Sequence, residues 1–162
     1  MAPGTRAAVF VLTATAIQLR LLCNLLDGML AVEEGLKSKT GEIYNELPDR
    51  VADVLILVGA GYSMRNLPAG PTLGWLAALT AIFTAYVRLL GGALGVTQHF
   101  IGPMAKQHRM FTLTIATLAA AVEAAFGMPQ RALGIGLAVI AAGSIVTACR
   151  RTHRIVGEVT AR

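Results

Sequence analysis

The sequence predicts an all-α protein, a polytopic transmembrane helical bundle. Of its 162 residues, 55% are hydrophobic and only 14% are charged, and the mean hydropathy is +0.63. A soluble domain carries about 25% charged residues, so this deficit indicates that lipid is the solvent. Apolar runs recur along the whole chain and are separated by short connections rich in Gly and Pro. Because each helix satisfies its own backbone hydrogen bonds in lipid, one bundle over residues 1–162 is the simplest arrangement.

A membrane-spanning helix needs about 20 mostly apolar residues, and about five segments of the chain fit this requirement. They are residues 8–31, 43–64, 72–96, 110–126 and 131–149. Gln18 and Arg20 interrupt the first segment. Small residues in the AAAVEAA and GIGLAVIAAG stretches favour close helix packing, and a homodimer seam is the alternative use for them.

The distribution of Lys and Arg predicts the orientation of the bundle. Basic residues gather in the loop at 32–42, in the loop at 97–109 and in the C-terminal tail. Short loops with an excess of Lys and Arg lie on the cytoplasmic side, so we expect an integral protein of the cell inner membrane with its N-terminus outside. A secretory signal peptide over residues 1–22 is the rival interpretation, but no A-x-A-like cleavage site follows.

Charge and composition exclude a nucleic-acid-binding protein. The net charge is +5 and the pI is about 9.8, but the basic residues lie between apolar runs rather than on one face. With 6% aromatic residues and one Trp, the chain has no stacking platform for bases. Cys23 and Cys149 both lie in apolar segments outside any metal-ligand spacing, so we expect them to be reduced packing residues.

Polar residues at helical spacing mark the first two segments. Asn24 and Asp27 are three residues apart near the end of the first segment. At the start of the second, Asn45, Asp49 and Asp53 follow one another at intervals of four, and Glu46 lies beside them. Residues three or four apart share a helix face. Because both helix ends meet at the 32–42 loop, we expect these side chains to converge on one cytoplasmic pocket.

Several carboxylates in one membrane pocket predict a divalent cation. Burying a carboxylate at the bilayer centre costs about 2.5–3.5 kcal/mol, and neighbouring carboxylates repel one another. Hard cations such as Mg²⁺, Mn²⁺ or Ca²⁺ relieve both penalties and prefer oxygen ligands. Gly28 and Gly41 allow close backbone approach, and together with a metal the flanking Lys37 and Lys39 indicate a phosphate-bearing ligand. Asp49 is placed to act as a general base. The alternative is an ion-pair cluster of Asp49, Arg50 and Asp53 that only anchors the bundle.

Residues 24–49 resemble the signature of the CDP-alcohol phosphatidyltransferase family, D-x-x-D-G-x-x-A-R-x8-G-x-x-x-D-x-x-x-D. Here the stretch reads N-L-L-D-G-M-L-A-V, then eight residues, then G-E-I-Y-N-E-L-P-D, and the spacing matches without a gap. Arg50 and Asp53 continue the likeness, and AYVRLLGGALG at 85–95 resembles family sequence more weakly. Three positions depart from the signature, because Asn24 and Asn45 replace Asp and Val32 replaces Arg.

The resemblance implies a membrane enzyme with Mg²⁺ or Mn²⁺ as cofactor. Such enzymes transfer a phosphatidyl or related phosphoalcohol group from a CDP-linked lipid donor to an alcohol or phosphoalcohol acceptor and release CMP. The resemblance assigns Asp27 to metal, Asp49 to base and metal, and Gly28, Ala31 and Gly41 to the nucleotide side. Asn24 and Asn45 hold the positions of two further metal ligands, Glu46 and Asp53 are candidates to restore the lost charges, and Lys37 or Lys39 is a candidate to replace the missing Arg near the diphosphate. Arg88 is a candidate to bind an acceptor phosphate, with snorkelling to the interface as the alternative. The family usually has six spanning helices, so we expect this chain to lack the first.

Two other functions remain open from the sequence. One is a non-catalytic membrane protein that keeps the fold and binds a nucleotide-lipid or a partner. The other is a small ion or proton carrier that uses Asp49 and Asp53, because ionisable residues inside a membrane commonly mark ion pathways. Glycines at fixed spacing favour the nucleotide interpretations over transport.

Overall fold

The computed structural model describes residues 2–33, 41–64, 67–97 and 101–161, apart from the side chains of residues 30–33 and 42. Within these ranges the chain forms five helices and no strand, which confirms the predicted all-α bundle. The helices are α1 (Pro3–Glu33), α2 (Gly41–Ser63), α3 (Gly70–Ala93), α4 (Lys106–Ala125) and α5 (Arg131–Thr160). The α5 helix continues well past residue 149, where the apolar run ends.

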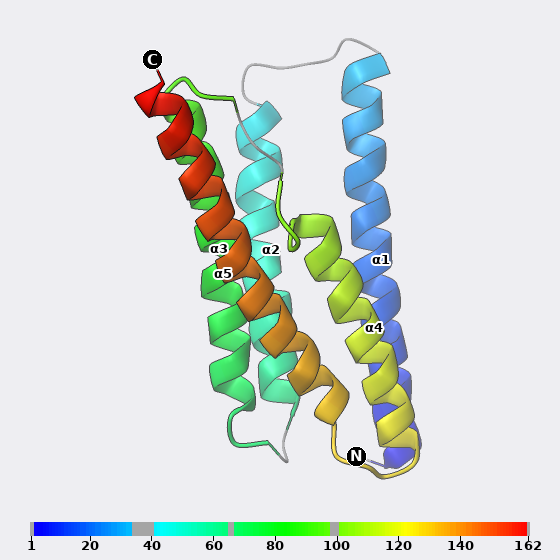
Figure 1. The fold of residues 1–162 in the computed structure, drawn as a ribbon. Coiled ribbons are helices and arrows are strands. Elements are labelled where there is room, and N and C mark those ends of the chain that lie inside the picture. Colours follow the sequence, from blue (N-terminus) through cyan, green and yellow to red (C-terminus); the bar gives the residue numbers. More distant parts are fainter. Residues whose placement is uncertain (1, 34–40, 65–66, 98–100, 162) are drawn as a thin grey trace.

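The helices pack side by side as one bundle (Figure 1). Extensive pairings join α1 to α4, α2 to α3, α3 to α5 and α4 to α5. The N-terminus lies at one end of the bundle, and the C-terminal end of α5 lies at the other, with the end of α1 and the start of α2. Consecutive helices α1 and α2 are therefore not close partners over their length, and α4 is the neighbour on which α1 packs.

Small residues let the helices approach closely, as the GIGLAVIAAG stretch predicts. A Cβ atom added to Gly136 in α5 would lie 2.4 Å from the Cβ of Ala116 in α4. Between α2 and α3, a Cβ on Gly61 would lie 2.6 Å from the carbonyl oxygen of Gly70. Alanines complete this interior, and Ala77 and Ala120 are fully buried. Leu137 is fully buried as well. Close backbone approach is the main source of helix association in lipid, where apolar side chains gain little by leaving the surroundings.

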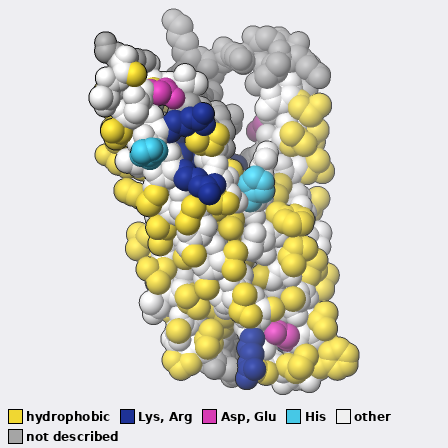
Figure 2. Space-filling model, viewed as in Figure 1, with side chains coloured by type: hydrophobic (Ala, Val, Ile, Leu, Met, Phe, Trp, Pro, Cys, Tyr) yellow, Lys and Arg dark blue, Asp and Glu magenta, His cyan; other side chains and the backbone are white. Residues whose placement is uncertain are grey.

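The outer surface is apolar, as expected for a membrane protein. Figure 2 shows hydrophobic side chains over the lower part of the visible face, with Lys, Arg and His more frequent toward the C-terminal end. Three described helices are long and apolar enough to cross a membrane, namely Pro3–Met29, Gly70–Ala93 and Arg131–Thr160. The other two predicted segments also form helices, but α2 carries Glu46, Asp49, Arg50 and Asp53, and α4 opens with Lys106 and Arg109.

We expect Gly136→Ala to destabilise the bundle. The added methyl group has to displace α4 from α5, and overpacking of this kind costs about 1–3 kcal/mol. Gly59→Ala is the matched control, because a Cβ added there would have no atom within 4 Å and the change adds helix propensity. Thermal unfolding in detergent should show a lower midpoint for Gly136→Ala and an equal or higher midpoint for Gly59→Ala. Equal midpoints for both variants would contradict the close packing of α4 on α5.

Candidate functional site

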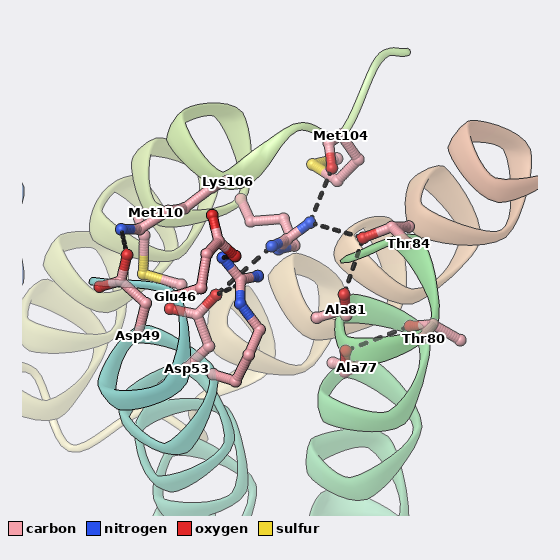
Figure 3. Close-up of polar contacts among 12 residues, drawn as sticks. Glu46, Asp49, Asp53, Ala77, Thr80, Ala81, Thr84, Met104, Lys106 and Met110 are labelled. Carbon is pink, nitrogen blue, oxygen red and sulfur yellow. Dashed lines mark hydrogen bonds and ion pairs between the residues drawn. The ribbon is translucent and has the colours of Figure 1, made fainter. Parts of the chain in front are cut away.

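Three carboxylates form a row on the inner face of α2. Glu46, Asp49 and Asp53 follow the i, i+3, i+7 spacing that keeps side chains on one face of a helix. Figure 3 shows all three directed toward the space between α2 and α4, with Lys106 reaching Asp49 from the start of α4. Asp53 lies deepest, with its side chain only 2% exposed. The row therefore runs from the open end of the bundle into its interior.

Cations from two other helices surround Asp49. Arg20 of α1 donates from Nη2 to Asp49 Oδ1 at 2.9 Å and to the Asp49 carbonyl oxygen at 3.1 Å. Asn24, one turn further along α1, donates from Nδ2 to the same Oδ1 at 3.2 Å. Lys106 of α4 donates from Nζ to Oδ2. Both oxygens of this carboxylate are thus engaged by protein donors.

Asp53 is held in the same way. Arg20 donates from Nη1 to Oδ1 at 2.9 Å, so its guanidinium bridges Asp49 and Asp53. Arg109 donates from Nη2 to Oδ2 at 3.3 Å, and Arg50 lies 3.8 Å from that oxygen. Arg109 is itself buried, with a side chain 2% exposed. Charge-assisted contacts of this type are the strong class of hydrogen bond, and they offset the desolvation of the buried charges.

Glu46 completes the cluster nearer the open end. Its Oε1 lies 2.6 Å from Arg88 Nη2 of α3, and its Oε2 lies 3.2 Å from Arg50 Nη2. Three carboxylates from one helix therefore meet five cations from four helices. The cations are Arg20, Arg50, Arg88, Lys106 and Arg109. The cluster has an excess of positive charge.

The segment before α4 is anchored on α5, and this places Lys106. Gly102 has a φ of +129°, which favours glycine, and a Cβ there would lie 2.4 Å from Thr147 Cγ2. The backbone N–H of Met104 donates to Thr147 Oγ1 at 3.0 Å. Arg151 of α5 donates from Nε to the carbonyl oxygen of Ile101 at 2.9 Å. These contacts set where α4 begins and hence where its first side chain points.

Two cavities adjoin the cluster. One, of about 440 Å³, is lined mainly by polar and charged residues: Glu46, Asp49, Arg50, Thr84, Ala85, Arg88, Ala105, Lys106, Gln107, His108, Arg109 and Arg151. The other, of about 720 Å³, lies between α1 and α4 and is largely apolar: Gln18, Leu21, Leu22, Asn24, Leu25, Gly28, Met29, Lys106 and Gln107. Lys106 and Gln107 line both. We call them the cationic cavity and the apolar groove.

The structure brings together about half of the predicted site residues. Asn24, Glu46, Asp49, Asp53 and Arg88 all belong to the cluster or its partners. Gly28 lines the apolar groove, whereas Gly41 is half-buried at the first residue of α2. Lys37 and the side chain of Ala31 lie outside the described residues.

Asp27 and Asn45 do not reach the cluster. Both side chains are exposed. The physical reason is the position of α4, whose first residue is level with Asp49, so the parts of α1 and α2 nearer their connection extend beyond it (Figure 1). Helical spacing places residues on one face, but only a neighbouring helix makes that face a pocket.

The arrangement does not fit the predicted Mg²⁺ or Mn²⁺ site. Within the part of the chain that the structure describes, no three His, Cys, Asp or Glu residues lie close enough to hold a metal ion. The oxygens of Asp49 and Asp53 already accept hydrogen bonds from Arg20, Lys106 and Arg109. The alternative of an ion-pair cluster describes the observed contacts better, although the cations of Asp49 come from α1 and α4 rather than from Arg50.

The cations of the cluster are what the sequence predicts least well. In the sequence, Arg20 stands out only as an interruption of an apolar segment, and Lys106 and Arg109 only as loop charges. One signal points to Arg20, because an Arg inside a spanning helix usually faces the bundle interior and pairs with an acid. Its position four residues before Asn24 places both on one face of α1.

These features define a helical membrane protein with a buried ion-pair cluster. No protein-family model matches the chain. The inner membrane protein YnbA of Escherichia coli (strain K12) is similar, with 28% identity over 115 residues. The match covers 70% of this chain and 55% of YnbA, so the chain spans about half the length of that curated relative. Together with the three apolar helices, this similarity supports a membrane location.

We expect Asp53→Ala to destabilise the protein strongly. The substitution leaves Arg109 buried without its carboxylate, and breaking a buried ion pair in this way costs about 3–5 kcal/mol. Asp27→Ala is the matched control, since its exposed carboxylate makes no ion pair within the described chain. Chemical unfolding in detergent should separate the two variants clearly. Equal stability would show that the buried pair contributes nothing to the fold.

Proposed function

We propose that this protein transfers a phosphatidyl or related phosphoalcohol group from a CDP-linked lipid donor to an alcohol or phosphoalcohol acceptor. CMP is the second product, and the reaction belongs to phospholipid synthesis. The proposal rests first on the signature-like residues 24–49. Asn24 and Asp49, which open and close that stretch, are in direct contact at 3.2 Å although they lie on different helices. The two halves of the motif thus share one site.

The observation that carries the proposal is the meeting of the two cavities at Lys106 and Gln107. A transferase for lipids needs one place for acyl chains and another for a polar acceptor. The apolar groove, with Leu21, Leu22 and Leu25 along α1, suits the chains of a lipid donor. The cationic cavity suits phosphate groups, because guanidinium and ammonium groups bind phosphate oxygens well.

In this mechanism the acceptor hydroxyl attacks the β-phosphorus of the donor. A new oxygen–phosphorus bond forms, the bond from that phosphorus to the bridging oxygen breaks, and CMP leaves with the bonding electron pair. Arg50, Arg88 and Lys106 are placed to neutralise the phosphate oxygens, which is the main form of catalysis in phosphoryl transfer. Asp49 takes the hydroxyl proton. Lys106 has to move aside first, because an ion-paired carboxylate is a weaker base.

We place the site at the cytoplasmic face of the inner membrane. The cluster opens toward the end of the bundle that holds the C-terminus, where Arg150, Arg151 and Arg154 also lie. The positive-inside rule assigns such an end to the cytoplasm. The excess of cations in the cavity favours a phosphorylated acceptor, such as glycerol phosphate or inositol phosphate, over a neutral alcohol.

A non-catalytic protein that binds a phosphate-bearing ligand is the second candidate. The observation that favours it is the engagement of both Asp49 oxygens by Arg20, Asn24 and Lys106. A carboxylate held in this way stabilises a fold more readily than it accepts protons. This candidate predicts binding of CDP or a sugar phosphate without turnover. The ion pairs of Asp49 and Asp53 argue against the alternative of an ion or proton carrier. A carrier of this kind needs carboxylates that exchange their partners.

We expect purified protein to release CMP from CDP-diacylglycerol with at least one acceptor in a panel of alcohols and alcohol phosphates. Each reaction is run with Mg²⁺, with Mn²⁺ and with a chelator. Asp49→Asn should abolish release, whereas Glu123→Gln, whose carboxylate lies on the N-terminal end of α5, should leave it unchanged. CMP is measured by chromatography. No release with any acceptor, from protein that is folded and monodisperse, would refute transfer and leave the binding candidate.

A substitution of Arg151 tests whether the cationic cavity binds a phosphorylated acceptor. This side chain is 5% exposed, lines the cationic cavity and donates from Nη1 to the carbonyl oxygen of Thr84 at 2.9 Å. We expect Arg151→Met to raise KM for a phosphorylated acceptor by about tenfold or more, because one charge-assisted contact is lost. KM for the donor should change little, and Arg150→Met, which alters an exposed neighbour, is the control. Equal increases in both KM values would place Arg151 outside the acceptor site.

A further inference from the structure

The hydrogen-bonding capacity of Asp49 is occupied from both sides. Oδ1 accepts from Arg20 and Asn24, and Oδ2 accepts from Lys106. In Asp53, Oδ1 accepts from Arg20 and Oδ2 accepts from Arg109. A divalent cation at these carboxylates would have to displace at least one guanidinium or ammonium group. The displaced cation would then remain close by, because it is tethered to the same bundle.

The direction of the Asn24 hydrogen bond also argues against a divalent cation at Asp49. Its amide nitrogen donates to Asp49 Oδ1, so its NH₂ group faces the carboxylate. A carboxylate at this position would instead bring a second negative charge against Asp49, and the pair would need a cation between them. With Asn at position 24, the amide hydrogen takes that place. The residue that departs from the family signature is therefore a donor in the cluster.

The overall positive charge of the site also disfavours a divalent cation. Five cations contact the three carboxylates, and the buried Arg151 adds a sixth cation to the cavity wall. Fixed charges inside a low-dielectric region interact strongly, so an approaching divalent cation is repelled and an anion is attracted. The electrostatics suit a ligand with phosphate groups without an intervening metal.

We propose that Lys106, supported by Arg20 and Asn24, takes the place of a divalent cation at Asp49, and that the cluster excludes Mg²⁺ and Mn²⁺. The ammonium group of Lys106 neutralises the carboxylate and presents a positive charge to both cavities. Phosphate groups in the cationic cavity then meet fixed side-chain cations directly. Metal exclusion follows from the ion pairs alone, and only the nature of the phosphate-bearing ligand rests on the proposed function.

Direct Mn²⁺ binding tests this inference without any assay of activity. The full chain is purified in detergent and titrated with MnCl₂, and free Mn²⁺ is followed by its electron paramagnetic resonance signal. We expect the wild-type protein to bind no Mn²⁺ stoichiometrically up to millimolar concentrations. Lys106→Met should bind Mn²⁺ at least about tenfold more tightly, because a positive charge in contact with Asp49 is removed. Lys106→Arg, which keeps the charge, should behave like the wild type.

Two further variants make the result specific. Arg131→Met removes the same charge at the opposite end of the bundle and should not increase Mn²⁺ binding. If Lys106→Met does not yield folded protein, Lys106→Gln keeps a hydrogen-bond donor for Asp49 and should show the same gain in affinity. Stoichiometric Mn²⁺ binding by the wild type would overturn the inference. So would equal Mn²⁺ affinity in the wild type and a folded Lys106 variant.

The Mn²⁺ titration gives its result whether or not the protein releases CMP. CMP release that requires Mg²⁺ or Mn²⁺ in the wild type would support transfer and overturn metal exclusion. Release that persists in the chelator supports both. If no acceptor gives CMP, transfer fails, and the Mn²⁺ titration still decides whether Lys106 occupies the metal position.

Discussion

Arg109 and Asp53 meet in the interior of the bundle, and the placement of the surrounding polar groups depends on this contact. Each side chain is 2% exposed, and the closest nitrogen and oxygen atoms are 3.3 Å apart. Neither charge is tolerable alone among apolar helices, because the penalty for desolvation is several kcal/mol per ion. Arg109 also donates from Nη1 to Thr84 Oγ1 and to the Met104 carbonyl oxygen, at 3.1 Å and 3.0 Å. One buried pair thus ties α2, α3 and α4 together.

The small-residue packing and the ion pairs divide the bundle between them. Toward the N-terminal end, glycines and alanines such as Gly61, Gly136 and Ala116 bring the helix backbones close together. Toward the other end, charged side chains line the cationic cavity, and Lys106 also lines the apolar groove. The two cavities give the charged end room for a ligand. The tight end holds the framework on which the charged side chains depend.

Much of the fold follows from the sequence, because hydropathy and Gly-Pro connections depend only on local residues. The row of acids on α2 follows as well, since helical periodicity sets which residues share a face. The partners of those acids do not follow, because Arg20 and Lys106 lie 29 and 57 residues from Asp49. Periodicity also cannot show where a neighbouring helix begins. The start of α4 at Lys106 is what leaves Asp27 and Asn45 exposed while enclosing Asp49.

Asn24 and the ion pairs act on Asp49 in the same direction, because each supplies that carboxylate with a hydrogen-bond donor. Asn24 brings no negative charge against Asp49, and its amide donates to that carboxylate. Lys106 and Arg20 add the positive charge that balances the carboxylate of Asp49. Either change alone would leave a charge poorly compensated in a half-buried site, whereas together they leave Asp49 satisfied. The amide at position 24 is therefore best understood with its partners across α1 and α4, and the proposal that Lys106 takes the place of a divalent cation rests on this combination.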